Sequence, residues 1–169
     1  NQHSSCNCSL ECAVEENCLG QCGVEIDDVY CTDNLNANLI SSGGFHNLAI
    51  NSDQEVFAWG RNNDGEINVP LDLNEVIKVA TGEYHSLALK SDGTVVAWGE
   101  NDNGQISVPE DLTNVIDISG GENHSLALKS DGTVVAWGHN NTNQLDIPSD
   151  LNSVVAISAG NDHNLALKA

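Results

Sequence analysis

Residues 76–114 read VIKVATGEYHSLALKSDGTVVAWGENDNGQISVPEDLTN, and residues 115–138 start the same pattern again as VIDISGGENHSLALKSDGTVVAWG. The same step of 39 residues separates the repeated histidines, the tryptophans and the glycines that follow the tryptophans. These positions are His46, His85, His124 and His163, then Trp59, Trp98 and Trp137, then Gly60, Gly99 and Gly138. So strict a period indicates repeated structural units, each packed on its neighbours.

Each unit alternates short β-type segments with turn residues. In residues 76–114 we expect strands at 76–80, 85–89 and 94–98, with a Ser-Asp-Gly hairpin turn before the third strand. We expect a short fourth strand at 105–108. Helical periodicity is missing from the unit. Four short strands in about 40 residues predict an all-β fold made of four-stranded β-propeller blades.

The quoted units resemble the repeat of the regulator of chromosome condensation family, in the compact form found in secreted bacterial proteins. The resemblance covers residues 28–169, and we treat this range as the repeat domain. It implies a propeller that has seven blades in the family's usual geometry. The family's functions are diverse and include a nucleotide-exchange factor, lectin-like modules and an inhibitor of β-lactamase. The basic character of the exchange factor is missing from this chain.

The blade count is the central feature of the repeat domain. We expect complete units at about 38–76, 77–115 and 116–154, and a half unit at 155–169. The half unit has only the strands at 154–158 and 163–168. Residues 29–44 align without a gap on residues 106–121, which places Val29, Tyr30 and Cys31 in a fourth-strand position. We therefore expect three complete blades and a fourth blade that is split between the two ends.

A split blade leaves a sheet edge that is a template for another chain. We expect the assembly edge to comprise Val29, Tyr30, Cys31, His163, Leu165 and Leu167. If the two parts of the blade join between copies, the contact is heterologous and produces a ring or a filament. Two alternatives stay open: a small four-bladed monomer closed by its own ends, and a fragment of a longer chain.

Residues 1–27 do not follow the repeat, and they form a separate cysteine-rich arm or cap, for which we expect a short helix. The cysteines of the chain are Cys6, Cys8, Cys12, Cys18, Cys22 and Cys31. Their even number in a small acidic segment favours disulfides and an oxidising compartment. Their spacing does not match the usual pairs of structural zinc sites. The pairing is left open, because six cysteines allow 15 arrangements.

Candidate catalytic and metal-binding residues all have a structural interpretation. The repeated histidines are periodic rather than convergent, so we expect each to hydrogen-bond within its own blade instead of binding metal. We expect the tryptophans to pack between blades and each following glycine to permit a turn. The Asn/Asp-rich turns do not fit a calcium loop, and no catalytic motif is present. We predict no enzyme activity, no metal and no cofactor.

Charge limits the class of partner. The chain has 5 basic and 25 acidic side chains, a net charge of −20, which disfavours nucleic acid and anionic lipid. It has no apolar run long enough for membrane insertion. We therefore predict a secreted, non-enzymatic structural protein that assembles with copies of itself. The alternative is an extracellular binding or inhibitor module that recognises a protein or glycan. Its variable positions are Phe45, Tyr84, Asn123 and Asp162, each just before a repeated histidine.

Overall fold

A computed structural model describes residues 39–169, and its regular structure consists of β-strands alone. The predicted all-β fold is confirmed. Within this part of the chain, no helix has the length and apolar character needed to cross a membrane.

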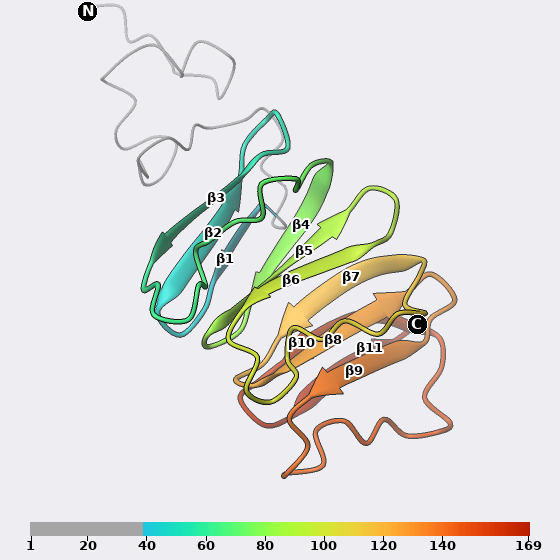
Figure 1. Cartoon of the computed structure of the whole chain (residues 1–169). Coiled ribbons are helices and arrows are strands. Elements are labelled where there is room, and N and C mark those ends of the chain that lie inside the picture. The colour runs from blue at the N-terminus through green and yellow to red at the C-terminus, as the bar shows by residue number, and fades with distance from the viewer. Residues whose placement is uncertain (1–38) are drawn as a thin grey trace, which may run out of the picture.

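Four antiparallel sheets follow one another in chain order. Blade 1 comprises β1 (Ile40–Ser42), β2 (His46–Ile50) and β3 (Val56–Gly60). Blade 2 comprises β4 (Val76–Thr81), β5 (His85–Lys90) and β6 (Val95–Gly99), and blade 3 comprises β7 (Val115–Gly120), β8 (His124–Lys129) and β9 (Val134–Gly138). Half-blade 4 has only β10 (Val154–Ala159) and β11 (Asn164–Lys168). Figure 1 shows the sheets side by side, with blade 1 and half-blade 4 at opposite ends.

The expected fourth strand at 105–108 does not form, so the complete blades have three strands instead of four. The amides of this segment bond within their own loop. Ile106 N donates to the Asn101 side chain at 3.1 Å, and Ser107 N donates to the Gly104 carbonyl at 3.0 Å. The Asn-rich turn therefore occupies the donors that a strand ladder would need. The N-terminal fourth-strand position, residues 29–31, lies outside the described residues.

The hairpin turns have the predicted chemistry. Asp92 Oδ1 accepts hydrogen bonds from the Thr94 amide at 2.9 Å and from the Thr94 hydroxyl at 2.6 Å. These bonds lower the pKa of Asp92. Gly93 has a φ of 81°, which favours glycine. The same arrangement recurs at Asp131 and Thr133.

The core consists of two apolar clusters, each shared by adjacent blades. Leu87 and Leu89 of β5 lie in one cluster with Trp137 and Ile118 of blade 3. The other cluster contains Leu48 and Ile50 of β2 together with Trp98 and Val79 of blade 2. In both clusters, alternate apolar residues of the middle strand of one blade face the next blade. The first strand of that next blade, here called its inner strand, and its tryptophan face back toward them. Complete burial of one such side chain stabilises the fold by about 1.5–3 kcal/mol.

Candidate functional site

The repeated histidines join consecutive blades. The ring nitrogen Nε2 of His46, His85 and His124 lies within hydrogen-bond distance of a side chain one blade further on. The pairs are His46–Ser86 at 2.9 Å, His85–Ser125 at 3.0 Å and His124–Asn164 at 2.7 Å. The expected hydrogen-bonding role agrees with these contacts, but the expected location within the histidine's own blade is wrong. The contact partner sits at the second residue of the next middle-strand pattern, His-Ser-Leu or His-Asn-Leu.

A loop carbonyl completes each contact between blades. The Glu66 carbonyl accepts hydrogen bonds from the Ser86 hydroxyl and from the Trp98 indole, both at 2.8 Å. The Gln105 carbonyl accepts the same two bonds, from Ser125 at 2.8 Å and Trp137 at 2.9 Å. At the third position, the side-chain amide of Asn164 donates to the Gln144 carbonyl. Within residues 39–169, no indole reaches that carbonyl.

Burial favours the neutral form of His46 and His85. His85 is 0% exposed, and its burial lowers the pKa of the ring to about 3. Charge on His46 or His124 would lower the pKa of His85 further. Burial likewise lowers the pKa of His46. Among the described residues, no group of three or more His, Cys, Asp or Glu side chains could hold a metal ion.

The two ends of the blade series expose residues that the interior blades bury. Leu165 and Leu167 of β11, here called the C-terminal end face, are 65% and 63% exposed. Their counterparts in blades 2 and 3 are 0–1% exposed; they are Leu87, Leu89, Leu126 and Leu128. His163 is also exposed, whereas the three preceding repeat histidines are buried.

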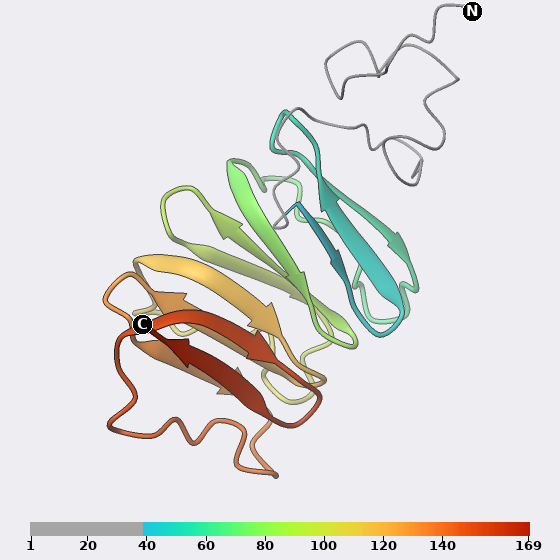
Figure 2. The same cartoon turned by 180° about the vertical axis from the view of Figure 1, so that it is seen from behind.

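Blade 1 exposes the opposite partner of such an interface, the surface that faces the preceding blade in blades 2 and 3. Ile40 is 64% exposed, whereas Val79 and Ile118 at the equivalent positions are 2% exposed. Trp59 is half-buried, whereas Trp98 and Trp137 are only 6% exposed. Ile40 and Trp59 are here called the N-terminal end face. Blade 1 and half-blade 4 lie at opposite ends of the blade series of residues 39–169 (Figures 1 and 2). Each of these end blades therefore carries exposed apolar side chains that the interior blades bury.

A second surface lies at the start of the middle strands, here called the rim. Phe45 directly precedes β2, and Tyr84 directly precedes β5. Their rings are stacked, with centroids 5.5 Å apart and planes 9° from parallel. The guanidinium carbon of Arg61 lies 4.3 Å from the Tyr84 centroid and 5.7 Å from the Phe45 centroid. These three residues are here called the rim cluster. Phe45 is 54% exposed, so the cluster presents aromatic surface to solvent.

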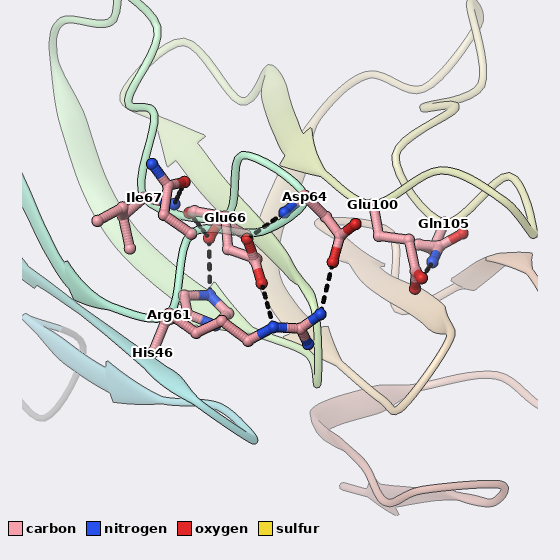
Figure 3. A network of polar contacts seen from close by, with 9 residues as sticks. His46, Arg61, Asp64, Glu66, Ile67, Glu100 and Gln105 are labelled. Carbon is pink, nitrogen blue, oxygen red and sulfur yellow. Dashed lines mark hydrogen bonds and ion pairs between the residues drawn. The ribbon is translucent and has the colours of Figure 1, made fainter.

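Carboxylates hold Arg61 in place, as Figure 3 shows. Arg61 Nη2 lies 2.9 Å from Asp64 Oδ2, and Arg61 Nε lies 3.5 Å from Glu66 Oε1. The Glu66 side chain is buried, and its other oxygen accepts a hydrogen bond from the Asp64 amide at 2.8 Å. Arg61 thus compensates a buried carboxylate and packs on two rings at once.

The charge around the rim is mainly negative. Partial burial raises the pKa of Glu100, and the neighbouring Asp64 and Asp102 raise it further. A hydrogen bond with Glu83 raises the pKa of Tyr84. Glu100 also accepts a hydrogen bond from Gln105 at 2.9 Å, which is the blade 2 counterpart of the pair Arg61–Glu66.

The glycines after the tryptophans are required by a close backbone contact. Gly60, Gly99 and Gly138 have φ values of 119°, 105° and 108°. A Cβ on Gly99 would lie 2.6 Å from the Tyr84 carbonyl oxygen. The expected role in permitting a turn agrees with this geometry. Of the remaining predicted site residues, the six cysteines, Val29 and Tyr30 lie outside the described residues.

Sequence reasoning did not find the partners of the repeated residues. Ser86, Ser125 and Asn164 follow the histidines directly, and their period of 39 was visible. A second pattern in the sequence pointed to contacts in the loop after each third strand. Two positions of this loop change together from one unit to the next: Arg61 with Glu66, Glu100 with Gln105, and His139 with Gln144. Gln144 Nε2 lies 3.1 Å from His139 Nδ1, so each pair is a direct contact.

Comparison with known families agrees with the repeat. The family model described as "Regulator of chromosome condensation (RCC1) repeat" matches residues 39–66, 76–105 and 115–144. These three matches together cover about half of the chain, and their starts repeat the period of the sequence. The chain has no match among curated protein sequences.

Solved structures with a similar fold come from yeast, plants and humans. Yeast RCC1 (Prp20), solved bound to Kap60, has a TM-score of 0.66 and 24% identity over 76% of this chain and 41% of its own. The CRINKLY WD40 ectodomain of the Arabidopsis thaliana receptor kinase ACR4 has a TM-score of 0.59 and 25% identity, covering 72% of this chain and 42% of its own. Human WBSCR16 has a TM-score of 0.64 and 21% identity, covering 90% and 53%. The chain thus spans about half or less of each structure, and the likeness confirms the predicted propeller fold.

Proposed function

Because the chain belongs to the regulator of chromosome condensation (RCC1) repeat family, we propose that it is a non-enzymatic, protein-binding propeller segment whose partners are copies of itself. Copies join head to tail, as a ring or a filament, and half-blade 4 of one copy packs against blade 1 of the next. Yeast RCC1 was solved bound to another protein, Kap60, which supports a general role in protein binding.

The exposure of Leu165 and Leu167 is the observation that carries this proposal. The same Leu-Ala-Leu segment is buried wherever another blade follows it, and it is 63–65% exposed in half-blade 4. Leucines packed against a following blade stabilise this fold, whereas two exposed leucines on one strand form an apolar patch that another surface can cover. We therefore expect this face to pack against the first strand and the tryptophan of another blade.

The N-terminal end face has the matching composition. In both interior clusters, middle-strand leucine or isoleucine packs with a tryptophan and an inner-strand Val or Ile of the next blade. Trp59 and Ile40 occupy these two positions in blade 1. The C-terminal face of one copy and the N-terminal face of another are therefore two halves of an interface that this chain already contains twice. Such a contact is heterologous.

The polar contacts of the interior interfaces continue across the proposed junction. His163 would meet Asn47 of the next copy, as His124 meets Asn164 within the chain. Position 47 carries Asn, like position 164, so the same pair of side chains is available. The junction would add directional hydrogen bonds to the apolar contact, which favours one register.

Charge on the C-terminal end face tests the proposal. The double change Leu165→Asp and Leu167→Asp should convert assemblies into 17.9 kDa monomers in sedimentation velocity. The fold should persist, because both side chains are already exposed in the single chain. If the native chain is monomeric at high micromolar concentration, the proposal is wrong.

Matched controls separate this face from general surface apolarity. Ile116 is 54% exposed on blade 3, and its counterparts Ile77 and Val155 are 43% and 53% exposed, so this position is exposed in every blade from blade 2 onward. Ile116→Asp should leave assembly unchanged. Ile40→Asp should block the other face, and a mixture of the Ile40→Asp and the double-leucine variants should form dimers only. Longer assemblies in that mixture would contradict a head-to-tail contact.

The rim cluster supports a second candidate, an extracellular module that binds a protein or glycan. Its stacked Phe45 and Tyr84 provide an exposed aromatic surface. Alanine at these two positions should leave head-to-tail assembly intact. Loss of assembly in this variant would move the contact from the end faces to the rim.

We also propose that the protein is secreted and that its cysteines form disulfides. The support is the even number of cysteines, all within the first 31 residues, and the acidic composition. An assembly reinforced by this arm would resist dissociation in an oxidising compartment.

A further inference from the structure

Carboxylates surround the rim cluster and outnumber its one guanidinium. They come from the loop after β3, the turn before β5 and the loop after β6, and they are here called the acidic rim: Asp64, Glu66, Glu83, Glu100 and Asp102. We infer that the acidic rim and the rings of Phe45 and Tyr84 form one binding site for an arginine side chain, carried by a basic segment of another protein.

Arg61 does not balance the charge of the acidic rim. Its guanidinium pairs with Asp64, and its Nε lies 3.5 Å from Glu66 Oε1. Glu100 lies near Asp64 and Asp102, and the net shift of its pKa is upward although Arg61 opposes it. A cation placed beside Glu100 would relieve this repulsion between carboxylates.

The buried carboxylate of Glu66 is an independent sign of a missing cation. Glu66 is 0% exposed, and its Oε1, which points toward Arg61 in Figure 3, has no hydrogen-bond partner. Blades 2 and 3 carry the neutral Gln105 and Gln144 at the same position. A buried carboxylate is costly unless it is fully paired. Glu66 therefore adds an incompletely compensated negative charge beneath the rim cluster of blade 1.

The aromatic rings favour arginine over other cations. Arg61 already shows the mode of contact, because its guanidinium carbon lies 4.3 Å from the Tyr84 centroid while the same group pairs with Asp64. The Phe45 ring, stacked on Tyr84, is 54% exposed and open to a second guanidinium. A planar guanidinium stacks on an aromatic ring and forms paired hydrogen bonds with carboxylates, whereas an ammonium group is a compact, strongly hydrated charge.

Charge also decides between a protein and a glycan as the partner. A neutral sugar would stack on the rings but would gain nothing from the surrounding carboxylates, and an anionic sugar would be repelled by them. The net charge of −20 further steers basic partners toward the chain. This inference rests on the second candidate function, in which the rim is a binding surface, and it does not involve the end faces.

The first test separates local recognition from attraction to an acidic protein. The probe is the fluorescent peptide Gly-Arg-Gly-Arg-Gly with capped ends, and binding to the full chain is measured by anisotropy. The double change Glu83→Gln and Glu100→Gln should weaken binding by about tenfold. Its matched control is Glu110→Gln with Asp111→Asn, which removes the same charge from an exposed turn between blades 2 and 3. The control should change the affinity less than twofold.

The second test examines the chemistry of the ligand. The peptide with citrulline in place of arginine keeps the planar shape without the charge and should not bind measurably. The lysine peptide should bind several-fold more weakly than the arginine peptide. Phe45→Leu should remove most of the difference between these two peptides, and its circular dichroism should match the native chain because Phe45 is already exposed.

Each unfavourable result has a definite meaning. Equal affinity for the arginine and lysine peptides, or equal losses in the two double variants, would overturn the arginine site. A neutral oligosaccharide that binds the native rim, and binds equally after Glu83→Gln and Glu100→Gln, would overturn it in favour of a glycan. Sedimentation velocity of the same variants should show unchanged assembly, so failure of peptide binding would leave the head-to-tail contact standing.

Discussion

His85 illustrates how a polar residue serves a buried interface. Its ring is 0% exposed and bonds to Ser125 of the next blade at 3.0 Å. The ring packs so closely on Gly82 that a Cβ there would come into direct collision with His85 Cε1, 2.1 Å away. A larger residue at position 82 would displace the ring, so the repeated glycine and histidine form one structural unit. Neutral imidazole suits this site, because burial of a charged ring would be costly.

Acid should destabilise the protein through His85. The unfolded chain binds a proton near pH 6.5, whereas the folded ring resists protonation until about pH 3. The stability that this ring contributes is complete above pH 6.5 and is lost as the pH falls toward 3. The contribution to the slope approaches about 1.4 kcal/mol per pH unit. Urea unfolding at pH 7, 6 and 5 should show this decline.

The matched variant is His85→Gln, which keeps a side chain able to hydrogen-bond but cannot titrate. It should be less stable at pH 7 and should show a smaller loss between pH 7 and 5. Parallel slopes for the two proteins would mean that folding does not lower the pKa of His85.

At the scale of the element, the end of each third strand is the most constrained point of a blade. Gly99 ends β6 with a φ of 105°, and Glu100 N then donates to the Tyr84 carbonyl at 3.0 Å. The strand must leave the sheet at this point, because the Asn-rich turn begins two residues later at Asn101. Glycine permits both the backbone conformation and the close approach to the Tyr84 carbonyl.

Two glycine substitutions separate conformation from contact. Gly104 also has a positive φ, 81°, but the nearest atom to its added Cβ is Ser107 Oγ at 4.0 Å. Gly104→Ala should cost about 1–2 kcal/mol in the free energy of unfolding, the strain of the left-handed region. Gly99→Ala should cost clearly more, because its Cβ also meets the Tyr84 carbonyl at 2.6 Å. Urea unfolding of both variants in the monomeric Ile40→Asp background measures the difference, and equal losses would contradict the contact.

At the scale of the whole molecule, interfaces between blades account for both stability and the proposed assembly. The interfaces between blades 1 and 2 and between blades 2 and 3 each combine an apolar cluster with the bonds of histidine, serine and tryptophan. Interfaces of this kind make a repeat protein a series of nearest-neighbour contacts. An uncovered end therefore presents the same chemistry as an interior interface.

The proposed disulfides belong to this scale, because they would link the arm of residues 1–27 to itself, to Cys31 or to another copy. We expect no reactive thiol in the denatured protein before reduction and six per chain after it. The measurement is titration with a thiol reagent in denaturant. Several free thiols in protein from an oxidising compartment would contradict disulfide formation, and nonreducing gel mobility would show whether any bridge joins two copies.

Most of the fold could be predicted from the repeat, whereas much of the site could not. The period, the Ser-Asp-Gly turn and the alternating apolar residues indicated the three strands of blade 2 and the two strands of half-blade 4 correctly. The strand predicted at 105–108 failed because Asn101 and Gly104 accept its amides within the loop. The sequence singled out Phe45 and Tyr84 as variable positions, but it did not predict that they stack on each other and on Arg61, because these residues come from different strand ends that meet only in the folded protein.

The sequence by itself determined the family, the propeller fold and the succession of three full units and a partial one, because these depend on local periodicity and turn chemistry. Only the tertiary structure decided what each repeated residue does. The leucines of His-Ser-Leu-Ala-Leu and His-Asn-Leu-Ala-Leu are indistinguishable in sequence, yet Leu126 is 0% exposed and Leu165 is 65% exposed. The physical reason is that burial depends on the neighbouring blade, not on the residue, so the exposed copies of a buried pattern appear only when the blades are placed in space.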